Sequence, residues 1–224
     1  MSQRLVRLLQ LTSPALPVGG YSYSQGLEAA IDAGFVADAP SAQSWTGEIL
    51  DDVLPAGELA VLSRLVRALP DDSGSFAAWH AWLRASRETR ELRAESEQMG
   101  HAMLAWMRDV GIADAALEAR AAAVAPLTWT GAFALACHAE HVAHDDALAA
   151  YAFAWLENQV LAAQKLVPLG QAAGQRMLRA LAARIPVAVA QAGALADDEV
   201  ASFAPGHALM SMRHETQYSR LFRS

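Results

Sequence analysis

The chain has 224 residues and a formal net charge of −7, and 54% of its residues are hydrophobic while only 18% are charged. Nothing in this charge balance favours nucleic-acid binding, which usually needs a basic face. The hydrophobic fraction exceeds the roughly 45–50% of ordinary globular chains, so we expect buried protein–protein surface in a homodimer or with another partner.

Cysteine use and hydropathy predict where the protein works. The single cysteine, Cys137, cannot form an internal disulfide, which fits a reducing cytoplasm. The apolar stretch at the N-terminus is too short for a signal peptide. The longest uncharged run, Ala121 to Ala139, contains Pro126 and Gly131, and it therefore predicts a buried core segment and not a membrane span. We expect a cytoplasmic protein without membrane contact.

Composition and the positions of helix-breaking residues predict the fold class. Ala, Leu, Arg, Glu and Gln dominate the chain, and all of them favour helices. No apolar–polar alternation of the kind found in strands is sustained, and Pro and Gly residues divide the chain into helix-sized segments. This predicts an all-α fold, a single-domain bundle of roughly eight to ten helices over residues 1–205 with a C-terminal docking tail over 206–224.

The first motif runs from Ser13 to Glu28 and reads SPALPVGGYSYSQGLE. Its two consecutive glycines before a helix could suggest phosphate binding, but the lysine of a Walker motif is absent. We therefore interpret it as a tight entry turn with at least one of Tyr21 and Tyr23 exposed. An exposed tyrosine is a common interface residue.

Serines are the predicted starts of three helices. Ser22 followed by Gln25 fits a capping box, with Ser24 as an alternative N-cap. Ser41 and Ser75 are the expected N-caps of the next two helices.

The second motif, SRETRELRAESEQMG, concentrates charge in a chain that is otherwise poor in it. Arg87–Glu91 and Arg93–Glu97 have the i,i+4 spacing of helical ion pairs. The common meaning of such a pattern is a solvated, salt-bridged face. The alternative is a specific polar interface.

Histidines form the third candidate site. His138, His141 and His144 precede Asp145 and Asp146, and two histidines at i and i+3 of one helix could chelate a metal. On a single helix the outer two would lie about 120° apart and be separated by a rise of about 9 Å, so one ion cannot easily bind all three. The alternative functions are therefore a metallochaperone or a bundle metalloenzyme, and the plainer interpretation is a surface helix end.

The segment from Leu148 to Leu166 is apolar on nearly every face, which predicts a helix at the centre of the bundle. Val167 precedes Pro168, which disfavours further helix, so Lys165 falls in the last turn. The residues after Gly206 allow three interpretations: a frayed end, a last bundle helix, or a docking peptide with arginines and apolar anchors.

Four segments together resemble the UreF family of urease accessory proteins. They are LPVGGYSYSQGLE (Leu16–Glu28), SRETRELRAES (Ser86–Ser96), QKLVPLGQ (Gln164–Gln171) and RHETQYSRLFRS (Arg213–Ser224). The resemblance implies an all-α dimer that is not an enzyme and needs no cofactor. It also implies a bridge between the accessory protein UreD (UreH) and the GTPase UreG, in a complex that delivers nickel to apo-urease.

The resemblance also implies site residues. It assigns docking on UreD to the tail residues Arg213, His214, Tyr218, Arg220, Leu221, Phe222 and Arg223. It assigns a dimer or UreG-facing surface to Tyr23, Glu28, Arg87, Glu88, Glu91 and Lys165. The histidine tract is not part of this pattern.

Overall fold

The computed structural model describes residues 3–70, 74–202 and 204–224, and it confirms the all-α prediction. The α-helices are α1 (Gln3–Leu11), α2 (Leu27–Asp32), α3 (Ala39–Glu48), α4 (Glu58–Ala68), α5 (Ser75–Ala85), α6 (Arg90–Asp109), α7 (Ala115–Ala123), α8 (Trp129–Ala139), α9 (His144–Leu166), α10 (Gln171–Ala182), α11 (Ile185–Ala194) and α12 (Pro205–His214). Three short helical segments complete them: η1 (Gly20–Ser22), η2 (Ile49–Val53) and η3 (Asp197–Glu199). The helices are slightly more numerous than expected, because short connections split several predicted segments.

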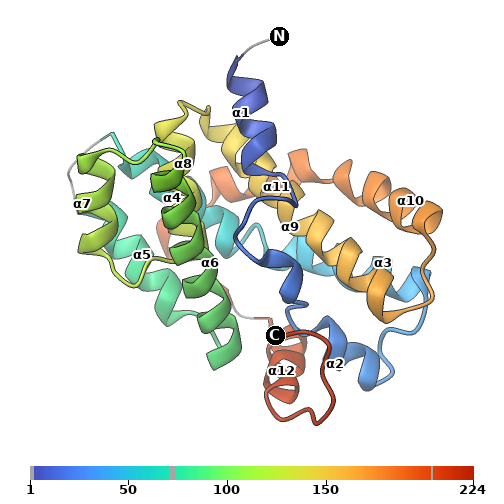
Figure 1. The fold of residues 1–224 in the computed structure, drawn as a ribbon. Helices are drawn as coiled ribbons and strands as arrows, with labels where there is room; N and C mark the ends of the chain where they lie inside the picture. Colours follow the sequence, from blue (N-terminus) through green and yellow to red (C-terminus); the bar gives the residue numbers. More distant parts are fainter. Residues whose placement is uncertain (1–2, 71–73, 203) are drawn as a thin grey trace.

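Helix α9 is the centre of the bundle, as predicted. It contacts α1, α2, α3, α4, α8, α10 and α11, and Figure 1 shows it crossing the middle of the molecule. Leu148 and Leu156 are fully buried, and Tyr151 and Val160 nearly so. The helix ends at Leu166 with Lys165 in its last turn, as the following Pro168 predicts.

The uncharged run from Ala121 to Ala139 forms part of the buried core, as predicted. It supplies the end of α7 and all of α8, whose residues from Thr130 to Cys137 are buried. Helix α8 packs against α4 and α6, and these helices gather on the left in Figure 1. None of the helices in the described ranges combines the length and the apolar character that crossing a bilayer would require.

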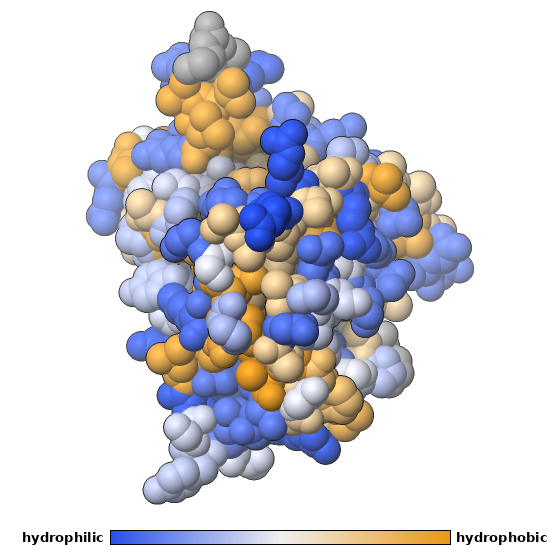
Figure 2. Space-filling view, turned by 90° about the vertical axis from the view of Figure 1, so that its right-hand side faces the viewer, coloured by the Kyte–Doolittle hydropathy of each residue, from blue (hydrophilic) through white to orange (hydrophobic). Residues whose placement is uncertain are grey.

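Two elements lie at the edge of the bundle. Helix α12 packs on α2, and the chain then turns back toward the body, as the red end of the ribbon in Figure 1 shows. At the opposite end α1 projects from the body (Figure 1) and leaves Leu5, Val6 and Leu9 about half exposed, at 45%, 50% and 58%. Figure 2 shows a hydrophobic surface on the projecting end of the molecule, at the top of the view.

The predicted helix starts are displaced by a few residues. Helix α3 begins after Asp38, whose carboxylate accepts the Ser41 N–H, so Ser41 is the reciprocal partner in the capping box and not the cap itself. Helices α2 and α5 begin after Gly26 and Gly74, which have φ of 82° and 76°. This left-handed conformation favours glycine, so these glycines precede the two helices where serine caps were expected.

Candidate functional site: the tail anchor and the adjoining cavity

Two acidic residues from distant helices hold one buried histidine. Glu28 lies in the first turn of α2, Glu91 in the first turn of α6, and His214 at the end of α12. The Nε2 atom of His214 is 3.2 Å from Glu28 Oε2, and its Nδ1 atom is 2.6 Å from Glu91 Oε2. The side chain of His214 is fully buried. Both ring nitrogens of His214 therefore face carboxylate oxygens.

The same two carboxylates hold the end of the chain. Glu28 accepts the main-chain N–H of Leu221 at 2.6 Å and that of Phe222 at 2.9 Å. Glu91 accepts a hydrogen bond from Arg220 at 2.6 Å. The two carboxylates are therefore contacted by the His214 imidazole and by the Arg220 guanidinium. We call these contacts the tail anchor: Glu28, Glu91, His214, Arg220 and the main chain of 221–222.

The entry turn holds the last residue. The carbonyl oxygen of Ser224 accepts from Ser24 Oγ at 2.6 Å, from Ser24 N at 2.8 Å and from Gln25 N at 3.0 Å. The Ser224 hydroxyl and the Gln25 amide each donate to Glu95 at 2.7 Å. Ser24, the alternative N-cap, and Gln25 of the expected capping box thus hold the tail, and Gln25 adopts a positive φ of 53°.

Glu95 is buried among these donors. Burial raises the pKa of its carboxyl, while hydrogen bonds from Ser224 and Gln25 act in the opposite direction. The spacing of Leu92, Glu95, Ser96 and Met99 places them on one face of α6, which is the face turned inward. This spacing was the signal that could have identified Glu95 and Ser96 from the sequence.

The i,i+4 pairs expected in the second motif are not the ones that form. Arg87 lies before the start of α6 at Arg90, and it pairs with Glu58 of α4. Glu91 is engaged by the tail anchor. Glu97 pairs with Arg84 of α5 at 2.9 Å, and Arg93 donates to the carbonyl of Arg87. Several charged side chains here connect segments while Arg90 and Arg93 are exposed, so the solvated-face interpretation holds only for part of the motif.

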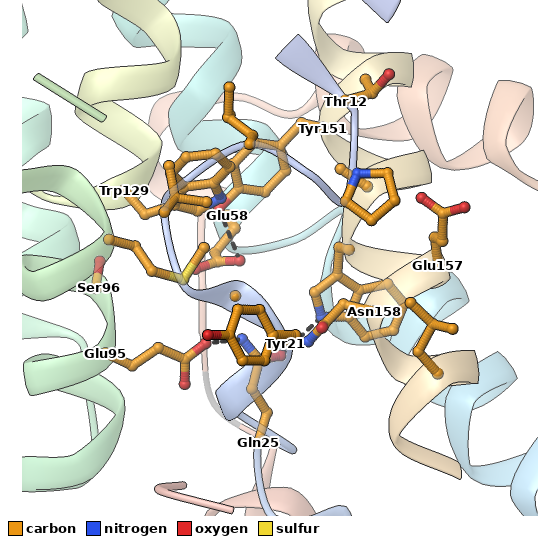
Figure 3. Close-up of a pocket in the computed structure, with 18 of the residues that line it drawn as sticks. Thr12, Tyr21, Gln25, Glu58, Glu95, Ser96, Trp129, Tyr151, Glu157 and Asn158 are labelled. Atoms are coloured by element: carbon orange, nitrogen blue, oxygen red, sulfur yellow. Dashed lines mark hydrogen bonds between the residues drawn. The ribbon is translucent and has the colours of Figure 1, made fainter. Parts of the chain in front are cut away.

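A cavity of about 100 Å³ is lined in part by Gln25 and Glu95, two of the residues that hold Ser224. Figure 3 shows Glu95 and Ser96 of α6 on one side of it, Glu157 and Asn158 of α9 on the other, and Tyr21 of the entry turn between them. A buried polar network stands behind it, in which the Tyr151 hydroxyl donates to Glu58 at 3.2 Å and contacts Thr130 at 2.9 Å. The cavity is thus bordered by two of the four motif segments.

The tail residues predicted from the resemblance fall into two groups. His214 and Phe222 point into the body, and Phe222 is only 6% exposed. Tyr218 is fully exposed and Leu221 is 65% exposed. The three arginines of the predicted set are also classed as exposed: Arg213, Arg220 and Arg223.

The second predicted set divides in the same way. Tyr23 is 4% exposed and its hydroxyl donates to Gln98 at 2.8 Å, so the exposed tyrosine is Tyr21. Glu28, Glu91 and Arg87 are turned inward, while Glu88 is partly exposed. Lys165 is exposed, and its Nζ lies 5.4 Å from the ring centre of Phe222 and 5.8 Å from that of Tyr21. Lys165 therefore joins the second set to the tail.

The histidine tract is not on one helix, which the metal alternative assumed. Helix α8 ends at Ala139, His141 lies in a turn with φ of 52°, and His144 is the first residue of α9. His144 contacts Ser63 Oγ at 2.9 Å and Asp145 at 2.7 Å. This has the order of a catalytic triad, but Ser63 is fully buried inside α4, where no substrate reaches it. Within the described ranges, no three metal-ligating side chains are grouped to hold an ion.

The comparisons with known proteins decide the family. The UreF family model matches residues 36–182. A urease accessory protein UreF from Bordetella parapertussis is 47% identical over 96% of this chain and all of its own length. The chain belongs to the UreF family. The Bordetella bronchiseptica protein of the same name is also 47% identical, with the same coverage.

A third relative is a fusion. The bifunctional urease accessory protein UreEF of Bordetella bronchiseptica is 48% identical over 99% of this chain, and the chain spans about half (52%) of that protein's length. The resemblance inferred from the four motif segments is therefore confirmed. The first and last of these segments lie outside residues 36–182, which the family model matches. The alignment to the Bordetella parapertussis UreF covers 96% of the chain.

Proposed function

We propose that this chain is a non-catalytic adaptor that bridges UreD (UreH) and the GTPase UreG, and so supports GTP-dependent nickel insertion into apo-urease. Its relatives are named urease accessory proteins, which supports a role within that assembly. GTP hydrolysis would be the task of UreG, in agreement with the missing Walker lysine in this chain.

The main support for the proposal is the tail, whose inner side is buried and whose outer side is exposed. The inner side is fixed by the tail anchor, and the outer side presents Tyr218 and Leu221 to solvent, with Arg213 and Tyr218 bordering one surface pocket. Exposed aromatic and arginine side chains on a fixed backbone are typical of the residues that dominate protein interfaces. We therefore assign the outer side to UreD, and we assign His214 and Phe222 the role of holding the tail in place.

The UreG-facing surface is proposed to begin at Lys165. The ammonium group of Lys165 lies over the rings of Tyr21 and Phe222. Lys165 is therefore next to the tail, and we propose that Lys165 and the tail form one continuous surface. Glu88 is the other partly exposed member of that predicted set.

Two further features belong to the same proposal. The exposed apolar face of α1 supports self-association or coverage by a partner, and we propose a cytoplasmic homodimer. Helix α12 packs on α2, so we propose that the body continues through His214 and that the docking segment follows it. This places the boundary later than the division at residue 205.

Co-purification of UreD with a set of variants tests the proposal. A Tyr218→Ala/Leu221→Ala double variant changes only the outer side, and deletion of 217–224 removes both sides. We expect both to lose UreD while far-UV helicity is retained. Val187→Ala, on a similarly exposed valine of α11, is the matched control and should bind normally. Normal UreD binding by the deletion variant would contradict the docking role.

A further inference from the structure

The cavity beside Gln25 and Glu95 is lined by polar side chains on one side and by apolar side chains elsewhere. Its apolar lining comes from four parts of the chain: Leu16 and Val18 of the entry turn, Leu92 and Met99 of α6, Trp129 of α8, and Trp155 of α9. Pro14 and Tyr21 border it and are exposed, so a small molecule can enter from solvent. Figure 3 shows how the entry turn, α6 and α9 surround it.

Two polar groups of the lining have no partner. The hydroxyl of Ser96, a residue that is 4% exposed, and the Nε–H of Arg87 are buried, and neither makes a hydrogen bond within the described structure. Buried polar groups are nearly always satisfied, and leaving one unpaired is costly. Arg87 offers a donor, and Ser96 offers a donor and an acceptor. Both residues line the cavity.

The surroundings define the charge of an occupant. A cation such as guanidinium offers only donors, and it cannot satisfy the Arg87 Nε–H. An anion would lie beside the carboxylates of Glu58 and Glu95, which also line the cavity. Arg87 is already paired with Glu58, so it does not offset a further negative charge. Burying a charge without a partner is unfavourable, which leaves a neutral molecule with a hydrogen-bond acceptor.

The volume restricts its size. Apolar cavities of about 150 Å³ accept benzene, so a cavity of about 100 Å³ holds a smaller molecule. Amides and ureas combine an acceptor and a donor on separate atoms within a small neutral group and, unlike alcohols, they are flat. Their flat faces also suit the indole rings of Trp129 and Trp155.

We propose that this cavity is a binding site for a small neutral molecule of the amide or urea class. Its carbonyl oxygen accepts from the Arg87 Nε–H, and its N–H donates to the Ser96 hydroxyl. Burial raises the pKa of the Glu95 carboxyl, which agrees with a site that favours neutral groups. The inference goes beyond the adaptor role, and neither depends on the other.

Titrations of the full-length ¹⁵N-labelled chain test it. The probes are acetamide, acetate and guanidinium, which share one planar shape and differ in charge. We expect acetamide to shift the indole N–H signals of Trp129 and Trp155 saturably, with a Kd on the order of millimolar for so few atoms. Acetate and guanidinium should bind about tenfold more weakly or not at all. Acetate would add a negative charge beside Glu58 and Glu95, and guanidinium cannot accept a hydrogen bond from the Arg87 Nε–H.

Variants locate the effect. Ser96→Leu fills the cavity and should abolish the acetamide shifts, and Ser96→Ala removes only the hydroxyl and should weaken binding several-fold. Ser86→Ala, outside the cavity, is the control and should titrate as the unchanged chain does. If circular dichroism shows that Ser96→Leu does not fold, Ser96→Ala decides.

Three results would overturn the proposal: no saturable shift with acetamide, equal affinity for the charged probes, or an unchanged titration in Ser96→Ala. Water would then be the sole occupant. Co-purification of UreD and UreG with Ser96→Ala is measured in parallel, and it reports on the adaptor role independently.

Discussion

The Glu28 carboxylate lies 3.2 Å from the Nε2 atom of His214, although 186 positions separate the two residues in the chain. Glu91 approaches the other ring nitrogen at 2.6 Å. The imidazole thereby joins α2 and α6 to the end of α12. The order of the tail depends on this side chain more than on any packing of the exposed residues that follow it.

Removing the imidazole should release the tail. His214→Ala leaves two buried carboxylates without their imidazole partner, and we expect a loss of about 3 kcal/mol in the free energy of unfolding, the usual effect of leaving a buried charge without a partner. Urea denaturation measures this loss, and proteolysis of the tail should accelerate. His101→Ala, on an exposed histidine of α6, is the control and should change stability by less than about 0.5 kcal/mol. Equal stabilities of the two variants would contradict the assigned role.

Arg220 should matter less than His214, although it binds the same carboxylate. Its side chain is 39% exposed, and pairs that reach solvent contribute little. We expect Arg220→Ala to cost under about 1 kcal/mol in the same urea experiment. A loss as large as that of His214→Ala would show that the anchor is shielded from water at both ends.

Lys165 tests the composite surface. Lys165→Ala removes the cation above Tyr21 and Phe222, a contact worth about 0.5–1 kcal/mol at an exposed site, so the fold should be retained. We expect recruitment of UreG to fall, and Lys165→Arg to keep most of it because the charge stays over the rings. Wild-type recruitment by the alanine variant in a pull-down would remove Lys165 from the proposed surface.

Acid should destabilise the fold through His80. Its Nε2 accepts the Thr128 N–H, and burial, with help from Arg84, lowers the pKa of the imidazole from 6.5 to about 4. Between these values the unfolded chain binds a proton that the folded chain does not. This contribution to stability is complete above pH 6.5 and is lost as the pH falls toward 4.

The size of the effect is on the order of 1–3 kcal/mol. Thermal unfolding followed between pH 7 and about pH 4, across the range in which an unperturbed histidine titrates, measures it. His80→Asn keeps an acceptor for the Thr128 N–H but cannot titrate, so its stability should depend less steeply on pH. An identical slope for the two proteins would assign the acid sensitivity to other groups.

Two helical glycines allow the effect of close helix packing to be separated from the effect of helix propensity. A Cβ on Gly100 of α6 would lie 2.2 Å from the carbonyl oxygen of Leu127, whereas a Cβ on Gly193 of α11 meets nothing closer than 3.9 Å. Gly100→Ala should therefore destabilise by about 2 kcal/mol or more. Gly193→Ala should stabilise by about 0.5–1 kcal/mol. Similar effects of both substitutions on chemical denaturation would show that α6 and α8 can separate.

Patterns within one segment of the sequence predicted the structural features that depend on that segment alone. The apolar segment from Leu148 to Leu166 predicted the central helix, and Pro168 predicted its end. The four motif segments identified the family before any comparison. Serine caps were displaced, because Gly26 and Gly74 supply the backbone geometry and because Asp38 is a better-placed acceptor for α3.

The pairing of charges could not be predicted, because it depends on contacts between distant segments. Glu91 was matched with the nearest arginine at helical spacing, whereas its partners in the structure are His214 and Arg220. Likewise, nothing local to Tyr23 distinguishes it from Tyr21, and only the position of Gln98 and the neighbouring helices shows which one is buried.

The anchoring of the tail from its inner side has a thermodynamic consequence for whatever binds the outer side. A segment held by Glu28 through two main-chain N–H groups has already lost its conformational entropy, so a partner docking on Tyr218 and Leu221 meets a preorganised epitope. Damage to the anchor should then weaken association without removing a single intermolecular contact. In calorimetry it should show as a larger entropic penalty on binding.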